Sequence, residues 1–146
     1  MKDYDPPMHT TEHVLNRTMV NMFHCGRAFS AHLEKKKSKC DYHFSRDLTI
    51  DEISQITTTV NNMLALHLPV NELFLTMDEA AGMVDVSKIP EHAKQERIRI
   101  VEVGDYDVCA CIGEHVKNTS EVKGMFEIIS TSYENNVLRI RFRIKE

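Results

Sequence analysis

Two stretches of the chain place apolar residues at the spacing of an amphipathic helix. The first runs over residues 9–29, and its apolar positions are Val14, Leu15, Met19, Met22 and Phe23. The second begins at Thr49, where Glu52 three residues on completes a capping-box pattern, and stops before Pro69. Its apolar face comprises Ile53, Ile56, Val60, Met63 and Leu64. We therefore predict two main helices.

The rest of the chain predicts short strands and turns. Alternating or continuous apolar residues favour strands over residues 40–44, 70–75, 98–103, 106–111, 124–129 and 137–144. We expect hairpin turns at 104–105 and 134–136, a solvated turn at 35–39, a short helix over 77–82, and a loop through Pro90 and His92. The sum is an α+β fold, in which a single domain over residues 1–146 packs two main helices on a mainly antiparallel sheet.

Composition fits one ordinary globular domain, since 42% of the 146 residues are hydrophobic and 27% are charged. Residues 1–7 lack the apolar core of a signal peptide, and the longest apolar stretch, residues 63–70, is too short to span a bilayer. We expect a soluble cytoplasmic protein without a membrane partner. The four cysteines are then expected to be reduced thiols, with a metal ligand possible among them.

Two short motifs contain metal-ligating residues. His9 and His13 lie one helical turn apart, so their imidazoles share a face. Taken alone, this pair is better explained as two surface histidines on a helix. Cys111 and His115, with three residues between them at the end of a predicted strand, supply two more ligands for a tetrahedral zinc site. Taken alone, Cys111 reads as a small buried residue at a strand end. Together the motifs predict a zinc ion held by all four side chains.

The two motifs resemble those of the alanyl-tRNA editing proteins and of the second additional domain of threonyl- and alanyl-tRNA synthetases. The likeness extends along nearly the whole chain. It includes the aromatic strand end at 42–44, the asparagines at 61–62, the strand at 97–101, the segment 115–128 and the final strand at 137–140. The sequence departs from the family pattern at Ile112 and Glu114, which replace a glycine and a threonine, and at 31–32, which replace a glycine-serine pair.

This resemblance implies a free-standing, trans-acting, zinc-dependent deacylase of mischarged aminoacyl-tRNA. Ser-tRNA(Ala) is the first expected substrate and Gly-tRNA(Ala) the second, because a pocket that hydrogen-bonds a hydroxyl discriminates strongly. Ser30 falls nearest the family's substrate-reading polar residue. Cys109 shares a strand face with Cys111, so it either lines the pocket, replaces a ligand or is a half-buried strand cysteine.

Two carboxylates adjoin the proposed ligands. Glu114 is a candidate general base, whereas Glu12 is expected to point away from its helical neighbours into solvent. The role of the zinc stays open, because a site closed by four protein ligands is usually structural and a catalytic site keeps an open position. The alternatives to a deacylase are therefore a non-catalytic, zinc-stabilised module that binds tRNA or a synthetase, and a hydrolase of another small ester.

Basic residues gather in two places. A net charge of −4 argues against a broad nucleic-acid-binding surface. Locally, however, contacts with the tRNA acceptor end are expected from Lys35, Lys36, Lys37, Arg139 and Arg141, the alternative being an ordinary solvated surface. The resemblance adds alanyl-tRNA synthetase as a second candidate partner, and an association with tRNA aminoacylation that includes nucleotide and ATP binding.

Overall fold

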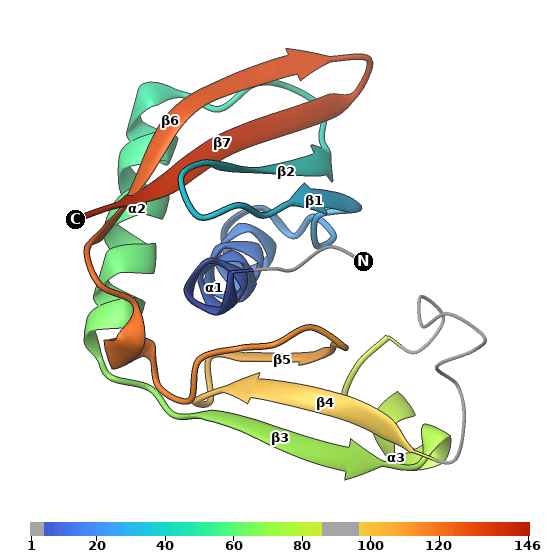
Figure 1. Cartoon of the computed structure of the whole chain (residues 1–146). Coiled ribbons are helices and arrows are strands. Elements are labelled where there is room, and N and C mark those ends of the chain that lie inside the picture. Colours follow the sequence, from blue (N-terminus) through green and yellow to red (C-terminus); the bar gives the residue numbers. More distant parts are fainter. Residues whose placement is uncertain (1–4, 86–96) are drawn as a thin grey trace.

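A single helix lies between two antiparallel sheets in this computed structural model, which describes residues 5–85 and 97–146 (Figure 1). A second long helix runs alongside, at one end of both sheets (Figure 1). The helices are α1 (Pro6–Phe23), α2 (Ile50–Ala65), α3 (Met77–Ala81) and the 3-10 turn η3 (Thr119–Glu121). The predicted loop at Pro90 and His92 and the first four residues lie outside the described segments.

The larger sheet has the strand order β1-β2-β7-β6 and the smaller one β3-β4-β5, with every neighbouring pair antiparallel. The strands are β1 (Ser30–His32), β2 (Ser38–His43), β3 (Val70–Leu75), β4 (Ile98–Val103), β5 (Asp107–Ala110), β6 (Met125–Glu134) and β7 (Val137–Lys145). The α+β class and the antiparallel pairing are confirmed. The strands form two sheets because α1 separates them.

Helix α1 has well-defined ends. Asp5 is the N-cap and accepts a hydrogen bond from the Met8 amide, and prolines occupy the first turn, where their missing N–H groups are not needed. The helix ends at Phe23. The amide of the C-cap residue His24 still donates to the Val20 carbonyl, and the left-handed conformation of His24 (φ 55°) turns the chain out of the helix. The predicted continuation to Phe29 is therefore wrong. The residues beyond His24 lead instead into β1, which the sequence pattern did not predict.

The predicted capping box at the N-terminus of α2 is present, since Thr49 and Glu52 bond each other's backbone amides reciprocally. The helix buries Ile56, Val60 and Leu64. In the β6–β7 hairpin, Asn135 and Asn136 have φ values of 51° and 63°, as a two-residue turn with a right-handed strand twist requires. These local predictions are confirmed because each depends on residues close together in the sequence.

The main core fills the space between the larger sheet, α1 and α2. Its largest fully buried side chains include Tyr42, Phe126, Leu138, Ile140 and Phe142. A smaller cluster of Ala80, Ile98 and Ile100 packs α3 on the smaller sheet. Because α1 is covered on two sides, it buries polar residues as well as apolar ones. This double burial places the histidines of α1 in the interior.

Candidate metal centre

Four side chains from two distant parts of the chain converge beside α1. His9 and His13 project from the first turns of the helix, while Cys111 and His115 come from the segment that follows β5. One ligand atom from each of the four lies within 4.8 Å of the others. His9 and His13 are buried, whereas Cys111 and His115 are half-buried, so the exposed part of the cluster lies on the side of residues 111–115.

Each imidazole has an outward partner at its Nδ1 atom. His9 Nδ1 lies 2.9 Å from the Glu114 carbonyl oxygen, and His115 Nδ1 lies 2.9 Å from Thr10 Oγ1. His13 Nδ1 lies 3.3 Å from Asp107 Oδ2. With a metal ion bound, a proton on each Nδ1 would face these oxygen atoms and the Nε2 lone pairs would bind the ion. Histidine ligands of metal sites are commonly oriented in this way.

The inner distances fit a tetrahedral zinc ion. Cys111 Sγ lies 3.3 Å from His9 Nε2 and 3.5 Å from His115 Nε2. Zinc bonds of about 2.0–2.1 Å to nitrogen and 2.3 Å to sulfur at tetrahedral angles place sulfur and nitrogen ligands roughly 3.5 Å apart. The four donors therefore match the ligand types that the ion prefers, and the spacing of Cys111, His9 and His115 matches a tetrahedral site.

The thiol of Cys111 is prepared for metal binding. Burial by itself would raise its pKa, but hydrogen bonds from His115, His13 and His9 outweigh burial and lower the pKa to about 3. Cys111 is consequently a thiolate at neutral pH, which is the form that binds metals.

Asp107 connects His13 to two arginines in the interior. Its carboxylate accepts hydrogen bonds from Arg17 Nε at 2.9 Å and from the Arg27 guanidinium at 2.7 and 3.2 Å. Burial by itself would raise the Asp107 pKa, but His13 and Arg27 together hold it well below its usual range. Burial also opposes the charge on His13, yet Asp107 and the Cys111 thiolate raise the His13 pKa to about 9.

The segment between Cys111 and His115 packs tightly against the first helix. A Cβ atom on Gly113 would lie 2.3 Å from His9 Cε1, so the imidazole occupies the space that any other side chain would need. Arg99 on β4 donates hydrogen bonds to the Cys111 carbonyl at 2.9 Å and to the Gly113 carbonyl at 2.7 Å. The backbone of this segment is thus held from both sides.

The sequence comparisons agree with this centre. Residues 98–141, which include Cys111 and His115, match the model for the threonyl and alanyl tRNA synthetase second additional domain. Alanine–tRNA ligases are similar over most of the chain: that of Petrotoga mobilis is 33% identical over 135 residues, and that of Aeropyrum pernix 34% over 139. These alignments cover 90% and 92% of this chain. The family match and these relatives together support a second additional domain of the editing type in this chain.

The chain spans only 15% of the length of either ligase. The second additional domain described here therefore corresponds to one part of those larger proteins, which supports an editing-type, tRNA-related domain. Among the described residues, no helix combines the length and the apolar character needed to cross a membrane.

Three further residues were predicted to belong to the site: Glu114, Cys109 and Ser30. Glu114 contributes its carbonyl to His9, while its side chain is exposed. Cys109 faces α1 near Arg27 and Asp107, and burial raises its pKa to about 11. Ser30 pairs with Asp41 in the larger sheet, on the face away from α1, since the neighbouring Ala31 packs toward the core.

Glu12 is buried, so the prediction that it is solvated is wrong. Its carboxylate accepts a 2.7 Å hydrogen bond from Asn16, and Asn16 in turn accepts a 2.7 Å bond from the Tyr42 hydroxyl. The reason is that α1 is covered by both sheets, so a residue beside the metal ligands meets protein and not water. Glu12 belongs to a buried polar network next to the centre, and its Oε1 atom lies 3.7 Å from His13 Nε2.

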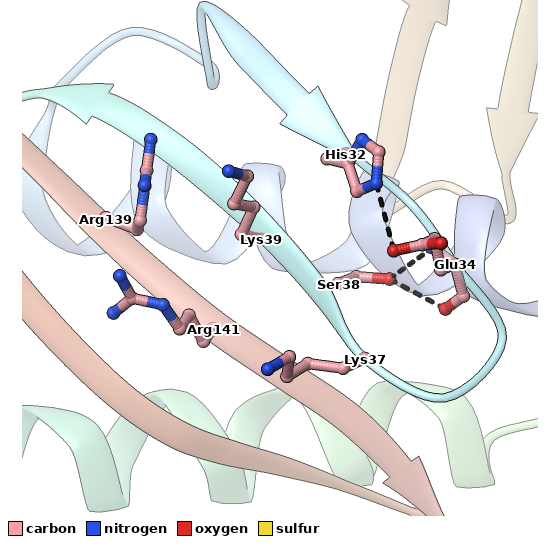
Figure 2. A pocket seen from close by; sticks show the side chains of 7 residues that line it. All are labelled: His32, Glu34, Lys37, Ser38, Lys39, Arg139 and Arg141. Carbon is pink, nitrogen blue, oxygen red and sulfur yellow. Dashed lines mark hydrogen bonds and ion pairs between the residues drawn. The ribbon is translucent and has the colours of Figure 1, made fainter. Parts of the chain in front are cut away.

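The predicted basic residues divide into two groups. Lys37, Arg139 and Arg141, together with Lys39, line an open hollow of about 350 Å³ on the larger sheet (Figure 2). Lys35 and Lys36 are exposed in the preceding turn and do not line it. Neither this hollow nor a second one at Phe23 and Phe44 touches the four metal-site residues.

Sequence reasoning missed the residues that orient the ligands: Thr10, Arg17, Arg27, Arg99 and Asp107. One signal was available, since Asp107, Cys109 and Cys111 alternate along one strand and share a face. Thr10 and Arg17 lie on α1 itself, whereas Arg27 and Arg99 come from other segments.

Proposed function

We propose that this domain binds one zinc ion through His9, His13, Cys111 and His115 and hydrolyses mischarged aminoacyl-tRNA. The observation that carries the proposal is the orientation of the imidazoles. Each Nδ1 atom faces an oxygen atom outside the cluster, and the Nε2 atoms of His9 and His115 lie 3.3 and 3.5 Å from Cys111 Sγ. Zinc bound there supplies Lewis-acid polarisation and lowers the pKa of a bound water toward about 7.

The substrate we propose is the ester between an amino acid and the terminal ribose of tRNA. Cys111 and His115 are half-buried and the intervening residues Ile112 and Glu114 are exposed, so an aminoacyl end can approach from this side. We propose Ser-tRNA(Ala) first and Gly-tRNA(Ala) second, with Cys109 as the substrate-reading residue. Ser30 is not kept in this role, because it lies on the face of the larger sheet that points away from α1.

Glu114 is the proposed general base. Its backbone is fixed through His9 and its side chain is exposed beside the centre. Replacing Glu114 by Gln is expected to lower deacylation at least about 100-fold if the carboxylate accepts the proton. The matched control is Glu134→Gln, an exposed glutamate in the β6–β7 hairpin. Unchanged turnover in Glu114→Gln removes this role and leaves the metal site intact.

The partners follow from this activity. We propose that the domain acts in trans in the cytoplasm on tRNA released by alanyl-tRNA synthetase, with backbone contacts from Lys35, Lys36, Lys37, Arg139 and Arg141. ATP binding is not carried forward, because no feature within residues 5–85 and 97–146 supports it.

A second function is a zinc-stabilised, non-catalytic module that binds tRNA or a synthetase. It is favoured by the presence of four protein donors, which together close a tetrahedral site.

One experiment separates the two. Hydrolysis of Ser-tRNA(Ala) is measured with and without a chelator, while circular dichroism and thermal unfolding follow the fold. If the chelator abolishes turnover while the fold is retained, the zinc is catalytic. If the protein shows no turnover before the chelator is added and unfolds after it is added, the zinc is structural.

A further inference from the structure

The outer face of the larger sheet carries two polar rows that cross all four strands. Residues directly opposite one another in antiparallel strands point to the same side. The first row is His32, Lys39, Arg141 and Ser130, and the second is Ser30, Asp41, Arg139 and Ser132. The alternating residues Cys40, Tyr42, Leu138 and Ile140 are fully buried toward α1. Both rows therefore face away from α1.

Positive charge is in excess on this face. Lys37, Lys39, Arg139 and Arg141 line the hollow together with the carboxylate of Glu34 (Figure 2). Glu34 is bonded to His32 at 3.0 Å, and Asp41 is bonded to Arg139 at 2.8 and 2.9 Å. Four cations against two carboxylates leave a surplus of positive charge on a chain whose net charge is −4.

Three of these cations are available to a ligand. The Arg141 guanidinium contacts only the hydroxyls of Ser130 and Ser132, at 3.4 and 3.5 Å. Within the described residues, no carboxylate lies at ion-pair distance from Arg141, Lys37 or Lys39. Guanidinium and ammonium groups in such a hollow suit the phosphates of a polyanion.

An aromatic pair adjoins the basic hollow on the same face. Phe29 stacks on His43 with ring centroids 4.0 Å apart and an interplanar angle of 14°, and 47% of Phe29 stays exposed. His43 lies four residues after Lys39 on β2, about 13 Å along the strand, and points to the same side. An exposed aromatic ring near a row of cations is typical of surfaces that bind single-stranded nucleic acid, because the bases stack on the ring and the phosphates pair with the cations.

We propose that the outer face of the larger sheet binds a single-stranded RNA segment, with phosphates on Lys39 and Arg141 and a base stacked on Phe29. An acidic peptide or an anionic lipid would use the cations but has no flat ring for Phe29. The choice of RNA rests on the proposed function, whereas the test measures binding and not hydrolysis.

The test measures binding of an unstructured RNA of about eight nucleotides, and of its abasic counterpart, to the intact chain over a range of salt concentrations. In a variant combining Lys39→Ala and Arg141→Ala, the slope of log affinity against log salt is expected to fall by about 1.4, since each phosphate contact on a single strand contributes about 0.7. Combined Arg97→Ala and Lys123→Ala substitutions, at two exposed sites outside this sheet, are the matched control and should leave the slope unchanged.

Phe29→Ala separates stacking from charge. Affinity for the RNA is expected to fall roughly 5- to 150-fold with an unchanged salt slope, and affinity for the abasic strand should not change. Parental binding in the double variant, or equal losses for RNA and abasic strand in Phe29→Ala, overturns the proposal. So does stronger binding of anionic vesicles that the same variants abolish. Unfolding midpoints verify that each variant is folded.

His9→Ala distinguishes failure of this inference from failure of the proposed function. RNA binding is expected to persist in His9→Ala, because His9 does not belong to the outer face. If the parent hydrolyses no aminoacyl-tRNA but shows the predicted binding pattern, the activity is wrong and the surface stands. If it hydrolyses Ser-tRNA(Ala) and the surface variants bind RNA normally, the surface proposal is wrong.

Discussion

His13 Nδ1 and Asp107 Oδ2 lie 3.3 Å apart in the interior, which is ion-pair distance, and among the described residues no hydrogen bond of good geometry reaches His13 Nδ1. Asp107 is held by Arg17 and Arg27, so the position of this imidazole depends on residues far from it in the sequence. This relationship makes the residues that orient the proposed metal ligands testable.

We predict that Asp107→Asn lowers zinc affinity about 10- to 100-fold, because the outer partner of a ligating histidine fixes its orientation and raises its basicity. Competition with a chromophoric chelator measures the affinity. Asp105→Asn, an exposed acid in the same hairpin, is the matched control. Equal affinities for the two variants would show that Asp107 does not support the site.

Gly113→Ala should disrupt the site by displacing the imidazole of His9. The new Cβ would lie 2.3 Å from His9 Cε1 and 2.7 Å from His9 Nδ1, so the imidazole has to leave its position. We expect zinc affinity to fall at least about 10-fold. Gly26→Ala is the control, since nothing lies within 4 Å of its Cβ and its affinity should be parental. Elemental analysis of both proteins after dialysis decides the matter.

Zinc binding should release protons near neutral pH. Without metal, the His13 pKa is raised to about 9 and the Cys111 pKa is lowered to about 3, so at pH 7 His13 is protonated and Cys111 is not. A metal ion must displace the His13 proton, so we expect release of about one proton per ion at pH 7, declining to none above about pH 9.

Because the proton competes with the ion, apparent zinc affinity should rise about tenfold per pH unit from pH 7 to 9 and then level off. Calorimetry in buffers of different ionisation enthalpy measures the released protons. A release that is absent at pH 7, or that grows as pH rises to 9, contradicts the assignment to His13.

His9→Ala should remove bound zinc, because it deletes one of four donors. We expect the metal content to fall from about one ion per chain to near zero at micromolar zinc, and deacylation to fall with it. His67→Asn is the control, since this exposed histidine has a left-handed conformation (φ 54°) that asparagine tolerates. Full metal content in His9→Ala would exclude His9 as a ligand.

The buried polar network predicts a stability difference. Tyr42→Phe removes the hydrogen bond to Asn16 Oδ1, which then keeps only the Ala28 amide at 3.1 Å. We expect unfolding free energy to fall by about 1–2 kcal/mol in denaturant titrations. Tyr133→Phe, whose hydroxyl is partly exposed and makes bonds of 3.1 and 3.2 Å, should cost less than about 1 kcal/mol. A larger loss in Tyr133→Phe would contradict this ranking.

Local features of the fold were predictable from the sequence. The capping box at Thr49 and Glu52 and the turn at Asn135 and Asn136 depend on neighbours within a few residues, and both are present. The four metal-site residues were predictable because their types and spacings restrict the chemistry. Their convergence required two elements to meet, and the paired motifs anticipated this.

By itself, the sequence determined the main elements, the antiparallel strands and the four donors, since these depend on short-range patterns of polarity and spacing. Only the tertiary structure decided that α1 lies between two sheets, which buries Glu12 and brings Asp107 to His13. It also gathered Lys39 and Arg141 in one hollow beside Phe29 and His43. These contacts join residues far apart in the chain, and their register depends on how sheets and helix pack, which no local pattern encodes.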